Sequence, residues 1–258
     1  MQRLTEIVPG VLTATAEFAT TTSTVVMAPD GGCLVIDPGV SVAELAGLAA
    51  DLAAAGLAPR AGFATHPHWD HVLWSAALGD VPRYAAPAAV AIWPEIREES
   101  LRYLEQSAPG HDLSLAGALT PLPAGAAAIP WDGPAARLII HDGHAPGHGA
   151  VFLPGAGVLA AGDMLSDIEI PLLDTEAGDP LGDYQTGLDR LAAVTGVTVL
   201  IPGHGHPGDA AELRRRLDAD RRYLDLLAAG RPFDDPRAAS GWLRDAHQRQ
   251  LEYVASHR

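Results

Sequence analysis

The sequence has little of three things: cysteine, long apolar runs and basic residues. The single cysteine, Cys33, lies in an apolar segment and cannot form an intramolecular disulfide, which fits a reducing compartment. The segment 1–6 lacks the continuous apolar core of a secretory signal. Every apolar stretch is interrupted by a charged residue, glycine or proline before the ~18 residues that a transmembrane helix needs. We therefore expect a cytoplasmic protein without a membrane span.

Acidic residues outnumber basic ones: 32 Asp and Glu against 17 Lys and Arg give a formal net charge of -15. An acidic surface repels phosphate backbones and anionic lipid headgroups, so we expect neither a nucleic-acid partner nor a membrane partner. Bulky polyanionic substrates are disfavoured for the same reason, although the charge of a bound metal can override the global field locally. The length allows a sizeable core, and nothing in it requires more than one large domain.

Short apolar or β-branched runs alternate with turns and helical patterns along the chain. Strands are expected over residues 10–14, 24–27, 33–37, 61–65, 137–141, 150–153, 157–161 and 197–201. Helices are expected over residues 42–55, 70–78, 88–106 with a break at Pro94, 183–193, and from 209 onward with a break near 230–233. The turn at 29–32 predicts that the strands on either side of it pair as an antiparallel hairpin.

The region from 86 to 136 is less regular than the rest. Its second half, 109–134, is rich in Gly, Pro and Ala and has too few large apolar residues for a core of its own. We interpret 86–136 as an insertion that shapes a substrate pocket. A disordered or purely structural excursion is the alternative.

The segment from Thr65 to His71 carries the most concentrated chemistry in the sequence. It holds His66, His68, Asp70 and His71, and imidazole nitrogen with carboxylate oxygen is the ligand mix that zinc and similar divalent metals accept. One ion would have difficulty using all four side chains from so short a segment, so we interpret it as half of a two-metal site. It follows an expected strand, where α/β enzymes carry functional loops. The alternative is a chance histidine cluster on a solvated loop.

Three further segments place a ligand-type residue beside glycine at the end of a strand or in a turn. They are 144–149, 161–164 and 202–206, with the sequences His-Ala-Pro-Gly-His-Gly, Ala-Gly-Asp-Met and Pro-Gly-His-Gly-His. Glycine lets the backbone approach a metal closely. Each segment alone is a weak signal, because a Gly-His pair in a turn is often incidental.

Taken in order, the four segments resemble the metallo-β-lactamase superfamily, whose pattern is H-x-H-x-D-H, then a histidine after Pro-Gly, an aspartate after Gly, and a histidine near the C-terminal third. The match extends from about residue 4 to residue 208. The resemblance implies an α/β fold: a four-layer αβ/βα sandwich of two mixed sheets, with helices on the outer faces and metals at one edge. We then expect a single domain over 1–258, with the insertion at 86–136 and a helical C-terminal tail at 209–258.

The resemblance also assigns metal ligands residue by residue. His66, His68 and His148 would hold the first ion, Asp70, His71 and His204 the second, and Asp163 would bridge both. A carboxylate suits the bridging position because each oxygen can serve one ion. The two ions would be divalent, with zinc expected first and iron or manganese as alternatives. Asp37, at a strand end, would support a ligand histidine from behind or simply form a turn. His144 and His206 lie near ligand positions, but the pattern does not need them.

The implied chemistry is hydrolysis: a metal-bridging hydroxide would cleave an ester, lactone, thioester or amide bond of a small, partly apolar substrate. Asp70 is the candidate catalytic residue, because it could manage the proton that reaches the leaving group. Trp69, Trp74, Trp93 and Tyr103 indicate apolar pocket walls, with core packing as the alternative. Whether the chain forms a homodimer is open.

Departures from known members narrow the choice of activity. Zinc β-lactamases lack the bridging carboxylate found here at Asp163, so a classical β-lactamase is less expected. Lactonases of the superfamily carry a tyrosine where this chain has Ser166, and glyoxalase II-like thioesterases carry basic glutathione-binding residues without a clear counterpart here. Two other classes stay open. One is a mononuclear iron sulfur dioxygenase using His66, His68 and His148, and the other is a non-catalytic metal-binding protein.

Overall fold

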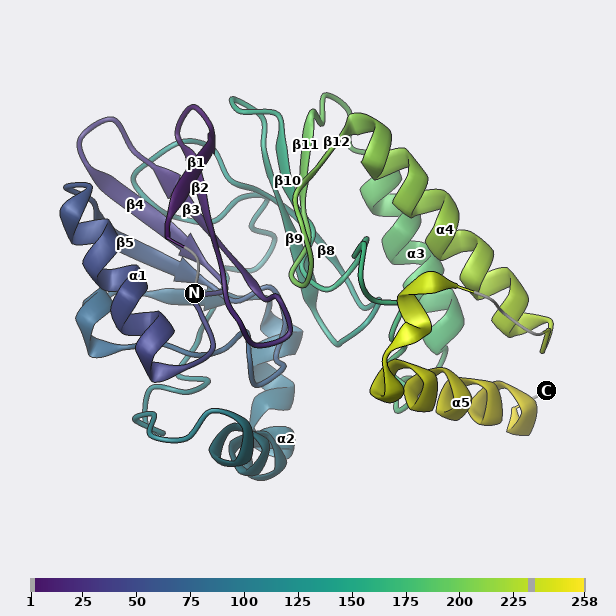
Figure 1. Ribbon diagram of the computed structural model, residues 1–258. Helices are drawn as coiled ribbons and strands as arrows, with labels where there is room; N and C mark the ends of the chain where they lie inside the picture. The colour runs from purple at the N-terminus through teal and green to yellow at the C-terminus, as the bar shows by residue number, and fades with distance from the viewer. Residues whose placement is uncertain (1–2, 232–234, 258) are drawn as a thin grey trace.

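The computed structural model describes residues 3–231 and 235–257, and within them two mixed β-sheets lie face to face (Figure 1). The first sheet has the order β1 (Thr5–Val8), β2 (Val11–Thr15), β3 (Thr22–Met27), β4 (Gly32–Ile36), β5 (Ala58–Phe63), β6 (Arg83–Ala85) and β7 (Thr120–Pro121). The second has the order β12 (Gly208–Asp209), β11 (Val199–Ile201), β10 (Val158–Ala160), β9 (His148–Leu153) and β8 (Arg137–His141). Strands β1 to β4 are antiparallel, β4 to β7 run parallel, and β10 pairs in parallel with β11.

Helices lie on the outer faces of both sheets. They are α1 (Val42–Ala54), α2 (Pro87–Ser107), α3 (Pro180–Ala192), α4 (Ala210–Ala228) and α5 (Gly241–Ser256), with short 3-10 helices η1 (Ala76–Leu78) and η2 (Pro236–Ala239). In Figure 1, α1 and α2 lie on the side of the first sheet, and α3 and α4 lie on the side of the second. The expected four-layer sandwich is therefore confirmed.

Alternation of side chains along the buried strands explains the layering, because successive residues of a strand point to opposite faces. Along β4, Cys33 and Val35 pack in the cluster that contains the apolar face of α1. Leu34 and Ile36 of the same strand pack between the two sheets, where they join Val151 of β9. Both faces of β4 are covered, so the parallel strands beside it form a rigid support for the loops at their carboxyl ends.

One sequence-based expectation fails next to the His66–His71 loop. Residues 70–78, all within the described part of the chain, form turns followed by η1, and no α-helix forms there. A surface helix buries one face only, whereas the consecutive residues Val72, Leu73 and Trp74 are all buried. The segment after His71 is therefore an irregular, buried connection.

The expected break at Pro94 is also wrong. Helix α2 is continuous from Pro87 to Ser107 with Pro94 inside it. Proline removes one backbone hydrogen bond, but residues on both sides of it are buried against the core, Trp93 before it and Leu104 after it. This packing holds the helix together across the proline.

The C-terminal region is helical, as expected. Helix α4 ends at Ala228 and α5 begins at Gly241, and the expected break at 230–233 falls partly outside the described residues. Leu243 and Val254 of α5 join the same apolar cluster as Leu224 of α4. Among the described helices, none is both long enough and apolar enough to cross a membrane.

Candidate metal centre

The loop after β5 carries the first group of candidate ligands, and Asp37 fixes this loop to the end of β4. Since β4 and β5 are parallel neighbours, their carboxyl ends lie side by side. Thr65 donates its backbone N–H to Asp37 Oδ1 (2.9 Å) and its hydroxyl to Asp37 Oδ2 (2.7 Å). The same Oδ2 lies 3.1 Å from Nδ1 of His71. Asp37 therefore lies behind a candidate ligand histidine, which is the first of the two roles left open for it by the sequence.

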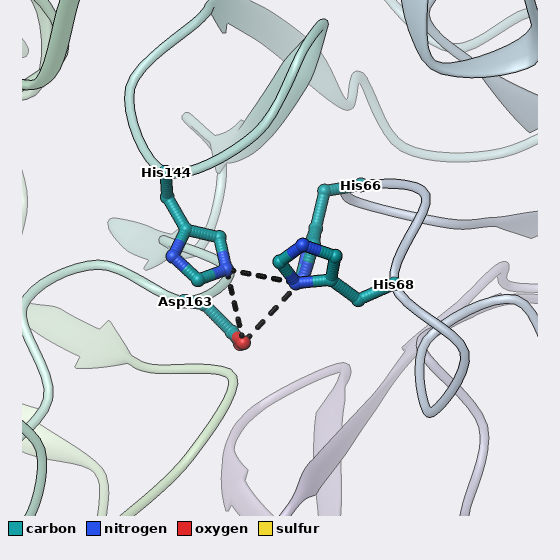
Figure 2. A group of neighbouring side chains, drawn as sticks. All are labelled: His66, His68, His144 and Asp163. Carbon is teal, nitrogen blue, oxygen red and sulfur yellow. Dashed lines mark hydrogen bonds and ion pairs between the residues drawn. The ribbon is translucent and has the colours of Figure 1, made fainter. Parts of the chain in front are cut away.

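Four side chains from three loops converge in one group: His66, His68, His144 and Asp163. Figure 2 shows the three imidazoles and the carboxylate pointing toward one another. His68 Nδ1 lies 3.0 Å from His66 Nε2 and 3.1 Å from His144 Nε2. Asp163 Oδ2 lies 3.4 Å from His66 Nε2 and 3.5 Å from His144 Nε2. The ligand atoms of the group all lie within 4.8 Å of one another, close enough to surround one ion.

A second group of Asp70, His71 and His204 lies beside the first. His71 Nε2 is 3.2 Å from His204 Nε2, which is in turn 3.3 Å from Asp70 Oδ2. Nδ1 of His204 is 3.0 Å from the carbonyl oxygen of Ala19, so a proton donated there leaves Nε2 free as a ligand atom.

Asp163 connects the two groups. Its Oδ1 lies 3.2 Å from His71 Nε2, and its Oδ2 lies 3.2 Å from His204 Nε2. The same Oδ2 also faces the imidazoles of the first group. A carboxylate in contact with both groups has the geometry of a shared ligand.

His148, which the sequence analysis assigned to the first ion, lies outside both groups. Its Nε2 accepts the backbone N–H of Asp163 (3.1 Å), and its ring stacks between those of His66 and His141. His148 is the first residue of β9, so its side chain belongs to the sheet, whereas His144 lies in the preceding loop with φ +75 and reaches the group. The assignment is corrected from His148 to His144. The sequence offered both histidines of His-Ala-Pro-Gly-His, but not the turn geometry that selects between them.

Burial keeps the imidazoles of the first group neutral. It lowers the pKa of His66 well below its usual value, lowers that of His68, and lowers the pKa of His144 to about 3. A neutral imidazole offers a lone pair, which is the form that binds a metal.

The carboxylates of the centre are held ionised. Burial would raise the pKa of Asp163, but His204, His71 and His66 bring it well below its usual value. Burial acts in the same direction on Asp70, where His71 and His204 lower the pKa to about 2. Burial opposes charge on His71 and His204 as well, yet the neighbouring carboxylates raise the pKa of both well above the usual value. The imidazoles of the first group are therefore neutral, whereas a metal ion at the second group would have to displace the protons of His71 and His204. The donor atoms of both groups fit divalent cations by type and number.

A cavity of about 540 Å³ opens over the two groups. It is bounded by His68, Asp70, Asp163 and His204 on one side and by apolar residues that include Phe18, Trp69 and Trp242. The rings of Phe18 and Trp69 meet edge to face at 5.2 Å. Water-excluding walls strengthen the electrostatic interactions of a site with whatever binds there.

Glu169 is a cavity residue that the sequence analysis missed. Its side chain lines the cavity although the residue is only 8% exposed, and burial raises its pKa to about 7. Its backbone N–H donates to Ser166 Oγ, and Ser166 in turn donates to the carbonyl oxygen of His204. Glu169 lies six positions after Asp163 with no motif around it, so only the fold reveals it.

Of the four aromatic residues that were expected to form pocket walls, two line cavities and two lie in the core. Trp69 and Tyr103 line cavities near the centre, whereas Trp74 and Trp93 are buried core residues. Helix α2 lines a second cavity through Ile92, Ile96 and Tyr103. The Gly- and Pro-rich segment 109–134, which the structure describes throughout, contributes no residue to either cavity. The pocket-forming part of the predicted insertion is therefore α2.

Comparison with known proteins agrees with this arrangement of sheets. Residues 18–224 match the family model of the Metallo-beta-lactamase superfamily. The chain belongs to this superfamily. A metallo-beta-lactamase family protein from Thermus thermophilus superposes with a TM-score of 0.66 at 24% identity, covering 87% of this chain and 83% of the other. A beta-lactamase domain protein from Burkholderia ambifaria superposes with a TM-score of 0.67 at 19% identity, covering 97% and 87%. These two likenesses show the fold.

Among curated proteins of the superfamily, a hydroxyacylglutathione hydrolase from Rhodobacter capsulatus is 35% identical over 127 residues. The matched region is 43% of this chain and 47% of that relative, so the chain spans about half the length of the curated protein it matches.

Proposed function

We propose that this chain is a metal-dependent hydrolase that holds two divalent ions, with zinc as the first candidate and iron or manganese as alternatives. His66, His68 and His144 would hold one ion, Asp70, His71 and His204 the other, and Asp163 would be shared. The observation that carries this proposal is the position of Asp163, whose two oxygens contact both groups. When bound, the ions would supply activated water and polarise the carbonyl that is attacked.

Two carboxyl groups of the cavity, those of Asp70 and Glu169, suit opposite roles: one as a proton acceptor and the other as a proton donor. The pKa of Asp70, about 2, keeps its carboxylate ionised, so this residue can accept a proton but is a poor donor. Burial brings the pKa of Glu169 to about 7, close to the value that favours donation to a leaving group at neutral pH. We therefore retain Asp70 as a candidate ligand and base and add Glu169 as the candidate acid.

The bond cleaved would be an ester, lactone, thioester or amide of a small, partly apolar substrate. The apolar walls at Phe18, Trp69 and Trp242 support a partly apolar molecule. The name of the Rhodobacter relative, a hydroxyacylglutathione hydrolase, supports testing thioesters first. A cytoplasmic location, the absence of nucleic-acid and membrane partners, and a homodimer stay predictions.

The two other activity classes have less support. A mononuclear dioxygenase would need one ligand group, but the described residues form two, and both contact Asp163. A non-catalytic metal-binding protein would have no use for the cavity that opens directly over both groups.

The experiment combines metal analysis with a substrate panel. Protein stripped with a chelator and reloaded with zinc is analysed by mass spectrometry for bound metal and assayed with an aryl ester, a lactone, a thioester and a β-lactam. We expect two ions per chain and turnover of at least one acyl substrate. Asp163→Ala is expected to lose at least one ion and most of the activity, whereas Asp218→Ala, an exposed aspartate of α4, keeps both. Unchanged metal content and rate in Asp163→Ala would reject the shared-ligand role.

A further inference from the structure

A second cavity of about 640 Å³ adjoins the metal centre. The two cavities share three lining residues, His68, Trp69 and Asp174. A substrate whose reacting carbon lies at the metal groups could therefore extend past Trp69 into the second cavity. The charge and polarity of the substrate portion that fits this cavity would decide the substrate class of the proposed hydrolase.

The second cavity has an apolar body with one hydroxyl in its wall. Helix α2 supplies Ile92, Ile96 and Tyr103 on one side, and Trp69 forms part of the wall toward the metal centre. Ser100 also lines it and is 8% exposed, yet its hydroxyl makes no hydrogen bond with any residue that the structure describes.

The charge around this cavity has one sign. Asp142, Asp174, Glu176 and Asp183 line it, and none of them forms an ion pair with a basic residue in the described part of the chain. A fifth acid, Glu99, is paired with Arg102 at 3.2 Å. The sequence contains no lysine, and no arginine lines either cavity within 3–231 and 235–257.

The acidic groups also act on one another. Burial and then repulsion from Asp142, Asp179 and Asp174 raise the pKa of Asp183. Carboxylates close enough to repel one another produce a negative potential at the mouth of the cavity. An anionic substrate end would be repelled by this potential, and Arg102 is already paired with Glu99. A cationic end would relieve the repulsion among the carboxylates.

We propose that the second cavity binds a cationic, apolar-bodied end of the substrate, such as a quaternary ammonium group, while the acyl carbon lies at the metal centre. Alkyl groups on nitrogen would contact Ile92 and Ile96, and the positive charge would lie near the rings of Trp69 and Tyr103, which attract cations through their π faces. This inference rests on the proposed hydrolase function. It separates the chain from an enzyme for glutathione thioesters, whose thiol portion carries net negative charge.

The test compares two substrates that differ in charge alone and adds a glutathione thioester as a third probe. The probes are butyrylthiocholine, its uncharged isostere in which carbon replaces the quaternary nitrogen, and S-butyrylglutathione, all assayed through the released thiol with the zinc-loaded protein. We expect kcat/KM for the cation to exceed that of the isostere by about tenfold, the size expected for attraction to partly exposed carboxylates. S-butyrylglutathione is expected to be the poorest of the three.

Variants locate the effect in the cavity. Asp183→Asn combined with Glu176→Gln removes two cavity charges without changing side-chain size, and is expected to lower the cation-to-isostere ratio about threefold to tenfold. The matched control is Glu105→Gln, an exposed acid of α2 outside both cavities, which should leave the ratio unchanged.

Binding of an unreactive analogue tests the cavity independently of turnover. The butyl thioether of thiocholine lacks the carbonyl, and calorimetry is expected to show tighter binding than for its carbon isostere, with the difference reduced in the double variant. Equal binding of the two thioethers, or turnover that favours the glutathione thioester, would overturn the inference while leaving the hydrolase proposal intact. If no ester, lactone, thioester or amide is cleaved but the thioether preference is observed, the hydrolase proposal fails and the cavity assignment survives.

Discussion

Separate replacement of the two histidines of His-Ala-Pro-Gly-His, His144 and His148, gives the sharpest test of the metal centre. The structure places His144 in the first group of candidate ligands and His148 outside it: His144 Nε2 lies 3.1 Å from His68 Nδ1, whereas His148 Nε2 accepts the Asp163 backbone N–H. We compare His144→Ala with His148→Ala. His206→Ala, at an exposed histidine paired with Asp167, serves as the control.

The expected magnitudes follow from what each ring does. Loss of a residue that only orients a ligand typically costs about 10- to 100-fold in metal affinity, so His148→Ala is expected to fall within this range. His144→Ala removes one of four donors of the first group. It should cost more than the ~100-fold upper end of that range, equivalent to about 2.7 kcal/mol. The control should match the parent protein.

The assay is a zinc titration against a chromophoric chelator, read together with metal content after dialysis. His148→Ala also leaves a buried N–H without an acceptor, which costs about 1–3 kcal/mol of folding stability. His148→Gln, which can supply an acceptor, should recover part of this stability and of the zinc affinity. A larger loss of affinity in His148→Ala than in His144→Ala would refute the reasoning and return His148 to the ligand set.

Two further predictions address groups outside the ligand set. Asp37→Asn weakens the partner of His71 Nδ1, 3.1 Å away, so zinc affinity should fall about 10- to 100-fold. Since one of the two acceptor oxygens for Thr65 is also lost, the thermal midpoint of the metal-free protein should fall as well; unchanged zinc affinity would mean that Asp37 serves only the turn. Burial, with the nearby Arg190 guanidinium, lowers the pKa of His141 to about 4 from its ordinary value of 6.5. As pH falls from 6.5 to 4, the imidazole of His141 gains a proton in the unfolded chain but stays neutral in the folded protein. This difference should lower the free energy of unfolding by up to about 3 kcal/mol over that interval. His141→Phe should show a shallower loss of urea stability over that interval with chelator present, and equal slopes would contradict this.

The sequence by itself determined the chemistry of the centre and most of the scaffold. Metal binding requires particular donor atoms, and the run from His66 to His71 shows them directly, since three imidazoles and a carboxylate so close together have few other uses. The strands could be predicted from the sequence for a similar reason. A strand that is buried on both faces must be apolar along its whole length, and β4 has such a sequence. The family membership followed from the order of such local signals.

Only the tertiary structure decided between neighbours of equal chemistry. His144 and His148 are both histidines in one turn, and the choice depends on where β9 begins and on the backbone conformation at residue 144, neither of which spacing specifies. The expected helix after His71 failed because burial on all sides overrode local propensity. Glu169 and the acids of the second cavity have no local signature, because their role comes from distant segments that the fold brings together. Local sequence fixes which atoms are available, and long-range packing fixes where those atoms meet.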